Sequence, residues 1–540
     1  MKLKNIFSAV AAAAMLTACV GDLNTIPLNE TDVTSETAYG AEEAGYVQGL
    51  TKIYFQLVSN NTQDLQVADG GASEFIRAFW STQEVTADAA KCAWGDAWVN
   101  DLNNNTWKGD VLNDAVYAVY VRTLQGITYV NEYLRQTSDA NLDLRGCSAD
   151  VKAKVQEYRA EARFLRAFFY WAAMDTFGQV PFSTEHTQFG GGYNPPQAPA
   201  AEIFDFIVSE LKDLASDGSA MPAAQSNYPR ADKGSVLGLL ARVYLNAEVY
   251  TGTAMWAEAK ATCEKIYDLD YYTLAPTHAE LFRGDNGENP DAKKEMLFAA
   301  SYNAEHTQSY GGTTYLTLST LSGDDGAVNI IGINGGWAGN RVPDHYVQTY
   351  FAPTAADFAT GDYTIADKRA YFYIKGRSQS MQDNLNTFLN GWSCIKFNNV
   401  PHDKEAVDYA ATAATKNFSD IDWPLIRLGE IHLIYAEACM HAGGDASAQV
   451  AALADRAGVA APKTIDADFL MAERARELMW EAHRRTDLIR YGKWISGYNW
   501  TYKGGNFGGQ DLPEHFNVFP VPSTELATNL DLDQNPGYAR

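Results

Sequence analysis

The stretch from Glu157 to Phe182 constrains the fold of this chain more than any other segment. Gly178 and Pro181 predict where its helix ends. Large apolar residues recur before them at intervals of three and four, which predicts one buried helical face: Ala162, Leu165, Phe168, Phe169, Ala172 and Ala173. Arginines lie among these residues, and in a core they would need fixed carboxylate partners: Arg159, Arg163 and Arg166. The alternative is an ordinary amphipathic helix with a solvated basic edge.

The composition describes a large globular protein. Of 540 residues, 46% are hydrophobic and 20% are charged, and this length can bury a sizeable core. The net charge of -25 argues against nucleic acid and against anionic membrane surfaces as partners. The chain has 30 Tyr and 12 Trp, more aromatic residues than a core needs, which is typical of surfaces that bind sugars or proteins.

The N-terminal region has the features of a secretory signal. Lys2 and Lys4 precede a short apolar run, and residues 1–18 are predicted to be a signal peptide. The segment Leu16–Cys19 resembles a bacterial lipobox, so Cys19 is the predicted lipidation site and residues 19–40 a lipidated tether. A plain signal peptide with a chance Cys is the alternative. No other segment approaches a membrane span, so we expect attachment through the lipid alone.

The cysteines do not form a recognisable framework. Lipidation of Cys19 would leave five of the six, an odd number without CxxC spacing. This pattern argues against a disulfide scaffold and against a structural zinc site, and we expect no metal ligands among these cysteines. Most of them are predicted to be small buried hydrophobic residues.

Helical periodicity and loops alternate along the chain. Helices are predicted in three regions: 41–57, 113–267 and 424–494. Long segments rich in Gly, Asn and aromatic residues lie between and after them: 59–109, 275–422 and 496–540. Small residues at close-packing positions resemble those of tetratricopeptide helix pairs. The predicted fold is therefore mainly α, a scaffold of tetratricopeptide-like helix pairs with long aromatic-rich loops.

Four segments together resemble the SusD/RagB family of outer-membrane nutrient-uptake lipoproteins from Bacteroidetes. They are Arg159–Phe182, Trp423–Ala438, Glu473–Gly492 and Phe519–Tyr538. Their order and separation match the family pattern along nearly the whole chain, which implies a single domain over residues 41–540. The later segments also bring acidic residues on apolar helices: Glu430, Glu437, Glu477, Glu481 and Asp487. We predict that these carboxylates pair with the arginines of the first segment in an internal network that locks helix pairs together.

The resemblance to the starch-binding members of the family also implies a ligand site. Carried over by similarity, the residues around an α-glucan would be Asp69, Arg77, Trp94, Tyr310 and Trp337. Trp98 competes with Trp94 for the stacking role. Sugar rings stack on Trp and Tyr, while Arg and Asp bind vicinal hydroxyls. The chain departs from the family where a sugar-binding Asn is expected, because Ala97 stands there.

Each of these residues also has a structural interpretation. Trp337 could anchor its own Gly-rich loop, and Tyr310 could cap a loop. Trp94 or Trp98 could belong to the core, and Arg77 could be an ion-pair partner of Asp69.

No sequence motif indicates catalysis. The chain contains no HExxH, GxSxG, P-loop or GxGxxG-plus-helix pattern, and its nine His show no metal or triad spacing, so we expect it not to be an enzyme. No cofactor is expected. A calcium ion near Asp285 and Asp420 is the one conceivable exception by analogy with the family, although Gly287 stands where a third acidic residue is expected.

The resemblance implies a lipid-anchored glycan-binding protein at the outer membrane, exposed at the cell surface. Such a protein would capture an oligosaccharide, with a starch-like α-glucan as the best prediction, and pass it to a SusC-like TonB-dependent outer-membrane transporter. The alternative is a RagB-like lipoprotein that binds peptides with the same loops. A surface glycosidase is the third hypothesis.

Overall fold

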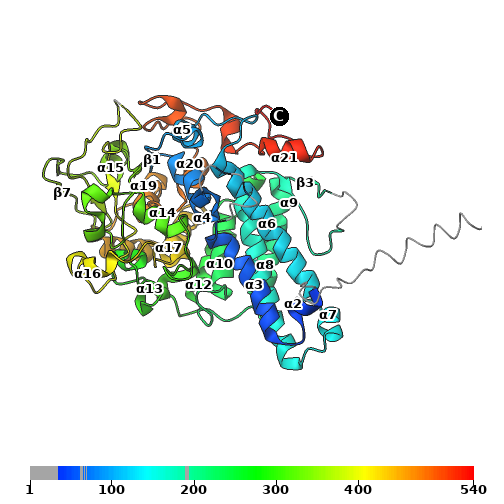
Figure 1. The fold of residues 1–540 in the computed structure, drawn as a ribbon. Helices are drawn as coiled ribbons and strands as arrows, with labels where there is room; N and C mark the ends of the chain where they lie inside the picture. The colour runs from blue at the N-terminus through cyan, green and yellow to red at the C-terminus, as the bar shows by residue number, and fades with distance from the viewer. Residues whose placement is uncertain (1–34, 61–64, 66, 68–69, 189–193, 383) are drawn as a thin grey trace, which may run out of the picture.

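The structure is a computed structural model that describes residues 35–60, 65, 67, 70–188, 194–382 and 384–540. The mainly α fold predicted from the sequence is confirmed. Long helices pack side by side at one end, and a loop-rich half lies beside them (Figure 1). The predicted lipidation site Cys19 and the predicted signal peptide lie outside the described residues, as does Asp69. The tetratricopeptide-like character of the helix pairs stays an interpretation.

The first two predicted helical regions, 41–57 and 113–267, contain the long helices of the scaffold. The long helices are α3 (Glu43–Val58), α6 (Asp114–Gln136), α8 (Ala149–Phe177), α9 (Ala200–Ala215), α10 (Lys233–Leu245) and α12 (Trp256–Tyr267), and the short helices α7 (Asp139–Leu144) and α11 (Ala247–Thr251) lie between them. The short helix α2 (Ser35–Tyr39) precedes these regions and lies in the segment 19–40 that was predicted as a tether. The third region contains α17 (Leu428–Ala442), α18 (Ser447–Ala457), α19 (Ala467–Glu477) and α20 (Arg484–Arg490). In the scaffold α8 packs against α6, α3 and α9, and α12 packs against both α10 and α17.

The segments predicted as loops also contain short helical elements. These are η2 (Gly70–Ser73), α4 (Phe75–Trp80), η3 (Ser81–Val85), α5 (Ala97–Asn104), η4 (His278–Phe282), α13 (Pro290–Glu295), α14 (Gly312–Leu318), η5 (Gly323–Asp325), η6 (Ala327–Asn329), α15 (Asp344–Tyr350), α16 (Ala406–Ala413), η7 (Lys503–Gly505), η8 (Glu514–Asn517) and α21 (Ser523–Thr528). Most are shorter than two turns, so they leave little periodicity for the sequence to reveal.

The strands described by the structure pair two by two, always antiparallel. The strands are β1 (Lys91–Cys92), β2 (Val180–Pro181), β3 (Gln197–Ala198), β4 (Met296–Ala300), β5 (Asn340–Arg341), β6 (Ala355–Asp357), β7 (Asp362–Thr364), β8 (Phe372–Tyr373), β9 (Ser393–Cys394) and β10 (Trp423–Arg427). The pair β4–β10 is buried and joins the loop-rich half to the start of α17. The pair β1–β5 joins two loop segments about 250 residues apart in sequence, from Lys91 to Arg341.

Helix α8 is the helix predicted from Glu157 onward. Its first turn is capped by the Ser148 hydroxyl, which accepts a hydrogen bond from the Val151 amide. Gly178 ends it with φ of 72°, a left-handed value that favours glycine. From Tyr158 on, nearly all its side chains are buried, including those of the predicted apolar face. The predicted helix and its end are confirmed.

The partners predicted for the arginines of α8 are wrong. Arg166 is 2% exposed and binds Glu185 and Glu210 at 2.5 and 2.8 Å. Arg163 also binds Glu210, and Arg159 donates to the C-terminal end of α6. The carboxylates come from the neighbouring helix α9 and the loop before it, because elements that follow each other in sequence also pack together here.

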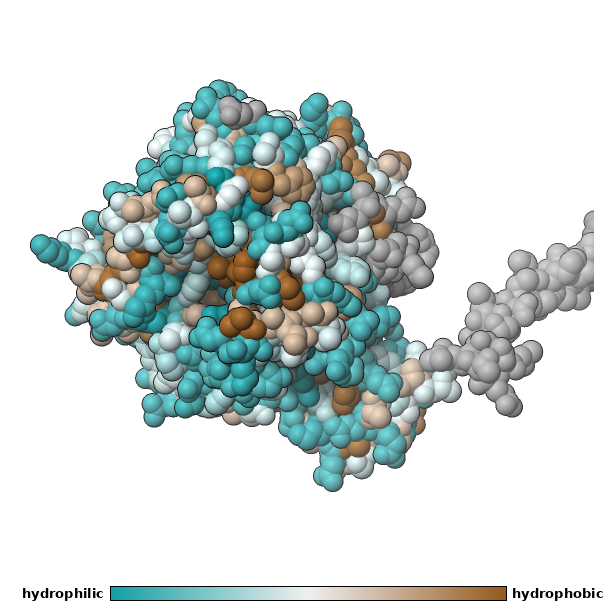
Figure 2. Space-filling view, turned by 60° about the vertical axis from the view of Figure 1, so that its left-hand side comes forward, coloured by the Kyte–Doolittle hydropathy of each residue, from teal (hydrophilic) through white to brown (hydrophobic). Residues whose placement is uncertain are grey.

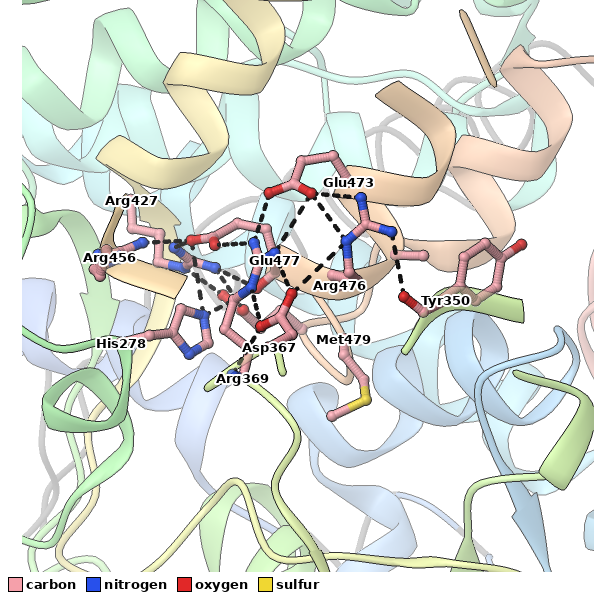
Figure 3. A network of polar contacts seen from close by, with 12 residues as sticks. His278, Tyr350, Asp367, Arg369, Arg427, Arg456, Glu473, Arg476, Glu477 and Met479 are labelled. Carbon is pink, nitrogen blue, oxygen red and sulfur yellow. Dashed lines mark hydrogen bonds and ion pairs between the residues drawn. The ribbon is translucent and has the colours of Figure 1, made fainter. Parts of the chain in front are cut away.

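The distant carboxylates form an internal network with other cations. Glu477, at the end of α19, binds Arg369, Arg427 and Arg456 at 2.8, 2.7 and 2.5 Å (Figure 3). Burial alone would raise the pKa of Glu477, but these guanidinium groups and His278 hold it well below its ordinary value. The predicted network of buried Arg–carboxylate pairs therefore exists, with different arginines.

Four further carboxylates predicted for the network are paired in the same manner. The pairs are Glu481 with Arg427 and Lys396, Glu430 with Arg242, Glu437 with Arg490, and Asp487 with Arg474. Arg369 and Lys396 belong to the loop-rich segment 275–422, whereas Glu477 and Glu481 belong to the scaffold region. The network therefore fastens the loops to the helices.

The five cysteines that the structure describes are free and buried, as predicted: Cys92, Cys147, Cys263, Cys394 and Cys439. Among the described residues, no helix has both the length and the hydrophobicity to cross a membrane.

Replacing Glu477 by Ala should cost about 3–5 kcal/mol of unfolding free energy, because three buried guanidinium groups would lose a shared carboxylate. Urea denaturation followed by circular dichroism measures this loss. The matched control is Glu132→Ala, which breaks an exposed pair with Arg135 and should cost at most about 1 kcal/mol. Equal stability of the two variants would contradict the role assigned to the network.

Candidate functional site

Three aromatic side chains from separate loops form an exposed cluster. The Tyr310 ring is 51% exposed, and its centroid lies 5.8 Å from that of Trp337 and 5.1 Å from that of Phe418. The rings of Trp337 and Phe418 are half-buried. The ring planes are tilted to the Tyr310 plane by 60° and 40°. We call these three side chains the aromatic cluster.

A glycine-rich turn places Trp337 in this cluster. Gly335 and Gly339 have φ of 95° and 117°, backbone values that residues other than glycine rarely adopt. The Trp337 amide donates to the Leu318 carbonyl at 2.7 Å, which fixes the turn against the end of α14. Nearby, the Asn334 side chain donates to the Asn417 side chain at 3.0 Å, so the turn is also tied to the loop that carries Phe418.

Trp94 belongs to a second group of stacked side chains. The guanidinium of Arg77, on α4, lies 5.4 Å from the Trp94 ring centroid and 4.3 Å from that of Tyr315. The Trp94 and Tyr315 rings meet edge to face at 5.8 Å. A cation over two aromatic faces is stabilised by the ring quadrupoles, more so when it is desolvated. Arg77 is 1% exposed, so it contacts Trp94 from the buried side of the ring.

Two glycines connect the Trp94 group with the aromatic cluster. A Cβ added at Gly339 would lie 2.4 Å from Nε1 of Trp94, so the indole packs directly on the turn that carries Trp337. A Cβ added at Gly71 would lie 2.5 Å from the Tyr310 carbonyl oxygen and 2.6 Å from Nη1 of Arg77. The structure therefore brings four of the predicted residues, Arg77, Trp94, Tyr310 and Trp337, into one region.

The other two predicted residues differ in what the structure says of them. Asp69 lies outside the described residues. Trp98, in α5, is 7% exposed and packs in the main hydrophobic core, whereas Trp94 is half-buried beside the exposed residues Gly95 and Asp96. Trp94 thus has more surface to offer a ligand than Trp98.

A buried carboxylate holds the loop that carries Tyr310. Glu74 accepts hydrogen bonds from the hydroxyls of Tyr302 and Ser309 and is itself inaccessible to solvent. Gly311 packs against it, since an added Cβ would lie 2.4 Å from Oε2. Burial raises the pKa of Glu74 to about 7, although the bonds from Ser309 and Tyr302 oppose this shift.

Sequence reasoning missed Phe418, Tyr315 and Glu74. Tyr315 follows Tyr310 by five residues, yet only its place in the helix α14 shows that it faces Arg77. Phe418 is a lone aromatic residue between polar ones, and Glu74 is a single acid before a short helix. Neither position has a local pattern that distinguishes a site residue from an ordinary one.

An apolar pocket elsewhere does not have the chemistry of this region. It has a volume of about 270 Å³ and lies between α3 and the end of β4, with Leu50, Phe55 and Ala299 in its walls. Its charged group, Arg230, is paired with the buried Glu161. Separately, Figure 2 shows apolar side chains gathered in a hollow on the side of the molecule where Figure 1 draws α14, α15 and α16. The exposed rings and neighbouring amides make the aromatic cluster the better candidate site.

Comparison with known proteins decides the family. The model of the SusD family matches residues 294–538, and one described as "Starch-binding associating with outer membrane" matches residues 56–245. The starch-binding protein SusD of Bacteroides thetaiotaomicron is 30% identical, and the alignment covers 99% of each chain. The chain belongs to the SusD family.

Solved structures share the fold of this SusD family member. A SusD superfamily protein from Parabacteroides distasonis matches with a TM-score of 0.69 at 21% identity, covering 94% of this chain and 100% of that one. A laminarin-binding SusD-like protein matches with a TM-score of 0.65 at 18% identity, covering 93% and 100% of the two chains. The family predicted from the four sequence segments is confirmed.

The calcium site considered by analogy with the SusD family stays a prediction. Asp285 is bound by the amide of His402 at 2.9 Å and by its ring at 2.6 Å, while Asp420 pairs with Lys416. A Cβ added at Gly287 would lie 2.6 Å from the Asp422 carboxylate. In the described ranges, no group of three or more His, Cys, Asp or Glu side chains is arranged to hold a metal ion.

Replacing Glu74 by Gln should change how stability depends on pH. The carboxyl group is protonated in both states below about pH 4.5, but between pH 4.5 and 7 only the folded protein retains the proton. The contribution of Glu74 to the unfolding free energy therefore falls as pH rises through this window, by about 3 kcal/mol. Urea denaturation at several pH values measures the difference in unfolding free energy between wild type and Glu74→Gln. This difference should show the fall and level off above pH 7.

The matched control is Glu305→Gln, which changes an exposed carboxylate on the same loop. Its stability should follow that of the wild type across the whole pH range. A pH-independent difference between wild type and Glu74→Gln would contradict the raised pKa.

Proposed function

We propose that this protein is a lipid-anchored, cell-surface glycan-binding protein that captures a starch-like α-glucan and delivers it to a SusC-type TonB-dependent transporter. The observation that carries the proposal is the exposed aromatic cluster of Tyr310, Trp337 and Phe418 in a chain similar over its full length to a starch-binding protein.

The chemistry of the cluster suits a carbohydrate. Sugar rings have apolar C–H faces that stack on aromatic rings, while their edges carry hydroxyls that need hydrogen-bonding partners. The amides of Asn334 and Asn417 lie beside the rings and are exposed. Because the rings of Trp337 and Phe418 are both tilted to that of Tyr310, the cluster favours a ligand that bends, as an α-glucan chain does, over a flat one.

Binding without catalysis fits the carboxylates of this region. Glycoside hydrolysis requires two carboxyl groups on either side of the scissile bond. Beside the cluster, Glu74 is buried beneath the Tyr310 loop and Asp420 is neutralised by Lys416. The relatives are also named for binding starch and laminarin, which favours a glycan over the RagB-like peptide alternative.

Affinity electrophoresis tests the proposal in gels containing amylopectin, glycogen, levan or xylan. Amylopectin and glycogen should retard the wild-type protein, and levan and xylan should not. Removal of a stacked ring costs about 1.5–3 kcal/mol, so Tyr310→Ala and Trp337→Ala should bind roughly tenfold to a hundredfold more weakly. Tyr271→Ala, which removes a 37% exposed ring from the turn after α12, is the control and should migrate like the wild type.

Four outcomes would contradict the proposal in different ways. Retardation by levan or xylan alone would replace the α-glucan with another polysaccharide. Retardation that persists in both cluster variants would place the site elsewhere. No retardation in any gel, together with binding of peptides, would favour the RagB-like alternative, and release of sugar from the gel would revive the glycosidase hypothesis.

The proposed anchor is tested separately by Cys19→Ala. Without the thiol the chain cannot be lipidated at this position, and it should move from the outer-membrane fraction to the soluble fraction after cell fractionation. Cys147→Ala, which changes a buried cysteine of the folded domain, serves as the control and should remain with the membrane. Continued membrane association of Cys19→Ala would contradict the lipid anchor.

A further inference from the structure

A loop from a distant part of the sequence lies directly against the backbone of Trp94. The side-chain nitrogen of Asn386 is 3.2 Å from the Ala93 carbonyl, 3.4 Å from the Trp94 carbonyl and 3.4 Å from Oδ1 of Asn100. Backbone carbonyls can only accept hydrogen bonds, so the amide nitrogen of Asn386 must face them. This contact fixes the orientation of the Asn386 side chain.

The loop that carries Asn386 is held by a buried cation. Arg341, in β5, is 1% exposed and donates to the carbonyls of Leu385 and Asn390 at 2.6 and 2.8 Å. Its third bond, at 2.7 Å, goes to the carbonyl of Gly339, the glycine on which the Trp94 ring packs. One guanidinium therefore fixes the loop and the support of Trp94 relative to each other.

This arrangement leaves the side-chain oxygen Oδ1 of Asn386 as an available hydrogen-bond acceptor. The side chain is exposed, and its nitrogen is directed at the protein. Within the described part of the chain, no donor bonds to Oδ1 of Asn386. A directional acceptor held against the backbone of a half-buried Trp is what a sugar ring stacked on that Trp requires at its edge. Ala97, in the first turn of α5 and three residues before Asn100, is exposed and offers no polar side-chain atom.

We propose that Asn386 is a specificity-determining residue of the Trp94 region, where its Oδ1 accepts a hydrogen bond from one hydroxyl of a sugar ring stacked on Trp94. This inference rests on the proposed function, because it requires that the protein binds a glycan. It adds a residue from the loop at 384–390 to the site. It also explains how the region supplies a polar contact although Ala97 cannot.

The loop offers further apolar surface next to Asn386. Phe388 and Leu389 are 40% and 47% exposed, so the loop presents a polar side chain followed by two apolar ones. A ligand longer than one sugar ring could extend from Trp94 along this surface. The affinity of the protein should therefore increase with the length of the oligosaccharide.

Isothermal titration of the purified full chain with maltoheptaose tests the role of Asn386. Loss of one neutral hydrogen bond weakens binding about fivefold to tenfold, and we expect this loss in Asn386→Ala. The control is Gln382→Ala, an exposed amide in the same loop, which should bind like the wild type. An unchanged affinity of Asn386→Ala would overturn the inference.

A loosened loop could also weaken binding, and a series of monodeoxy maltotriosides separates this effect from a direct bond. If Oδ1 accepts from one hydroxyl, wild type and Asn386→Ala should bind the ligand lacking that hydroxyl equally, while they differ for all others. A loss of the same size with every deoxy ligand would mean that Asn386 acts only on loop position, and would overturn the inference.

The same titrations distinguish failure of the proposed function from failure of the inference about Asn386. If the wild type bound no maltooligosaccharide, the α-glucan proposal and the role of Asn386 would both be refuted. If the wild type bound, Trp337→Ala lost affinity and Asn386→Ala did not, only the inference about Asn386 would be refuted.

Discussion

The buried ion pairs around Glu477 are the interaction on which the rest of the structure depends. A carboxylate in a core is costly to desolvate, and it is tolerated here because Arg369, Arg427 and Arg456 surround it. These cations come from the loop-rich segment, from β10 and from α18, so the cost is offset only when all of these parts are in place. The network therefore makes the loops and the scaffold fold together, whereas apolar contacts alone would tolerate many relative positions.

The site depends on the same principle at a smaller scale. Its loops contain few strands or helices, so their carbonyls and amides need partners other than regular secondary structure. Arg341 supplies three hydrogen bonds to backbone carbonyls, and Glu74 binds two hydroxyls below Tyr310. Buried ionisable groups thus take the role that a sheet or helix has in other binding sites, and they keep exposed rings in place without a ligand.

The sequence predicted what local patterns encode. The periodicity of apolar residues predicted α8 and its end at Gly178, because burial of one helical face leaves a regular signal. It could not predict that Arg166 binds Glu185 and Glu210, since ion pairing depends on which helices are neighbours. The resemblance indicated the region of Trp94 and Tyr310. Phe418 reaches that region through tertiary contacts between loops, and these leave no periodic pattern.

The arrangement of the site constrains the size of its proposed ligand. Trp94 is supported from behind by Arg77 and packed on Gly339, so only part of its ring remains for a ligand. Tyr310, Trp337 and Phe418 form a second exposed surface in the same region, with Trp337 on the glycine-rich turn that the Trp94 ring contacts. A single sugar ring stacks on one aromatic face at a time, and each contact is worth only a few kcal/mol. The Trp94 indole packs on Gly339, in the turn that carries Trp337, and Arg341 holds the carbonyl of that glycine. A glycan chain that contacts both surfaces therefore gains affinity without the cost of ordering the loops, which favours oligosaccharides over monosaccharides.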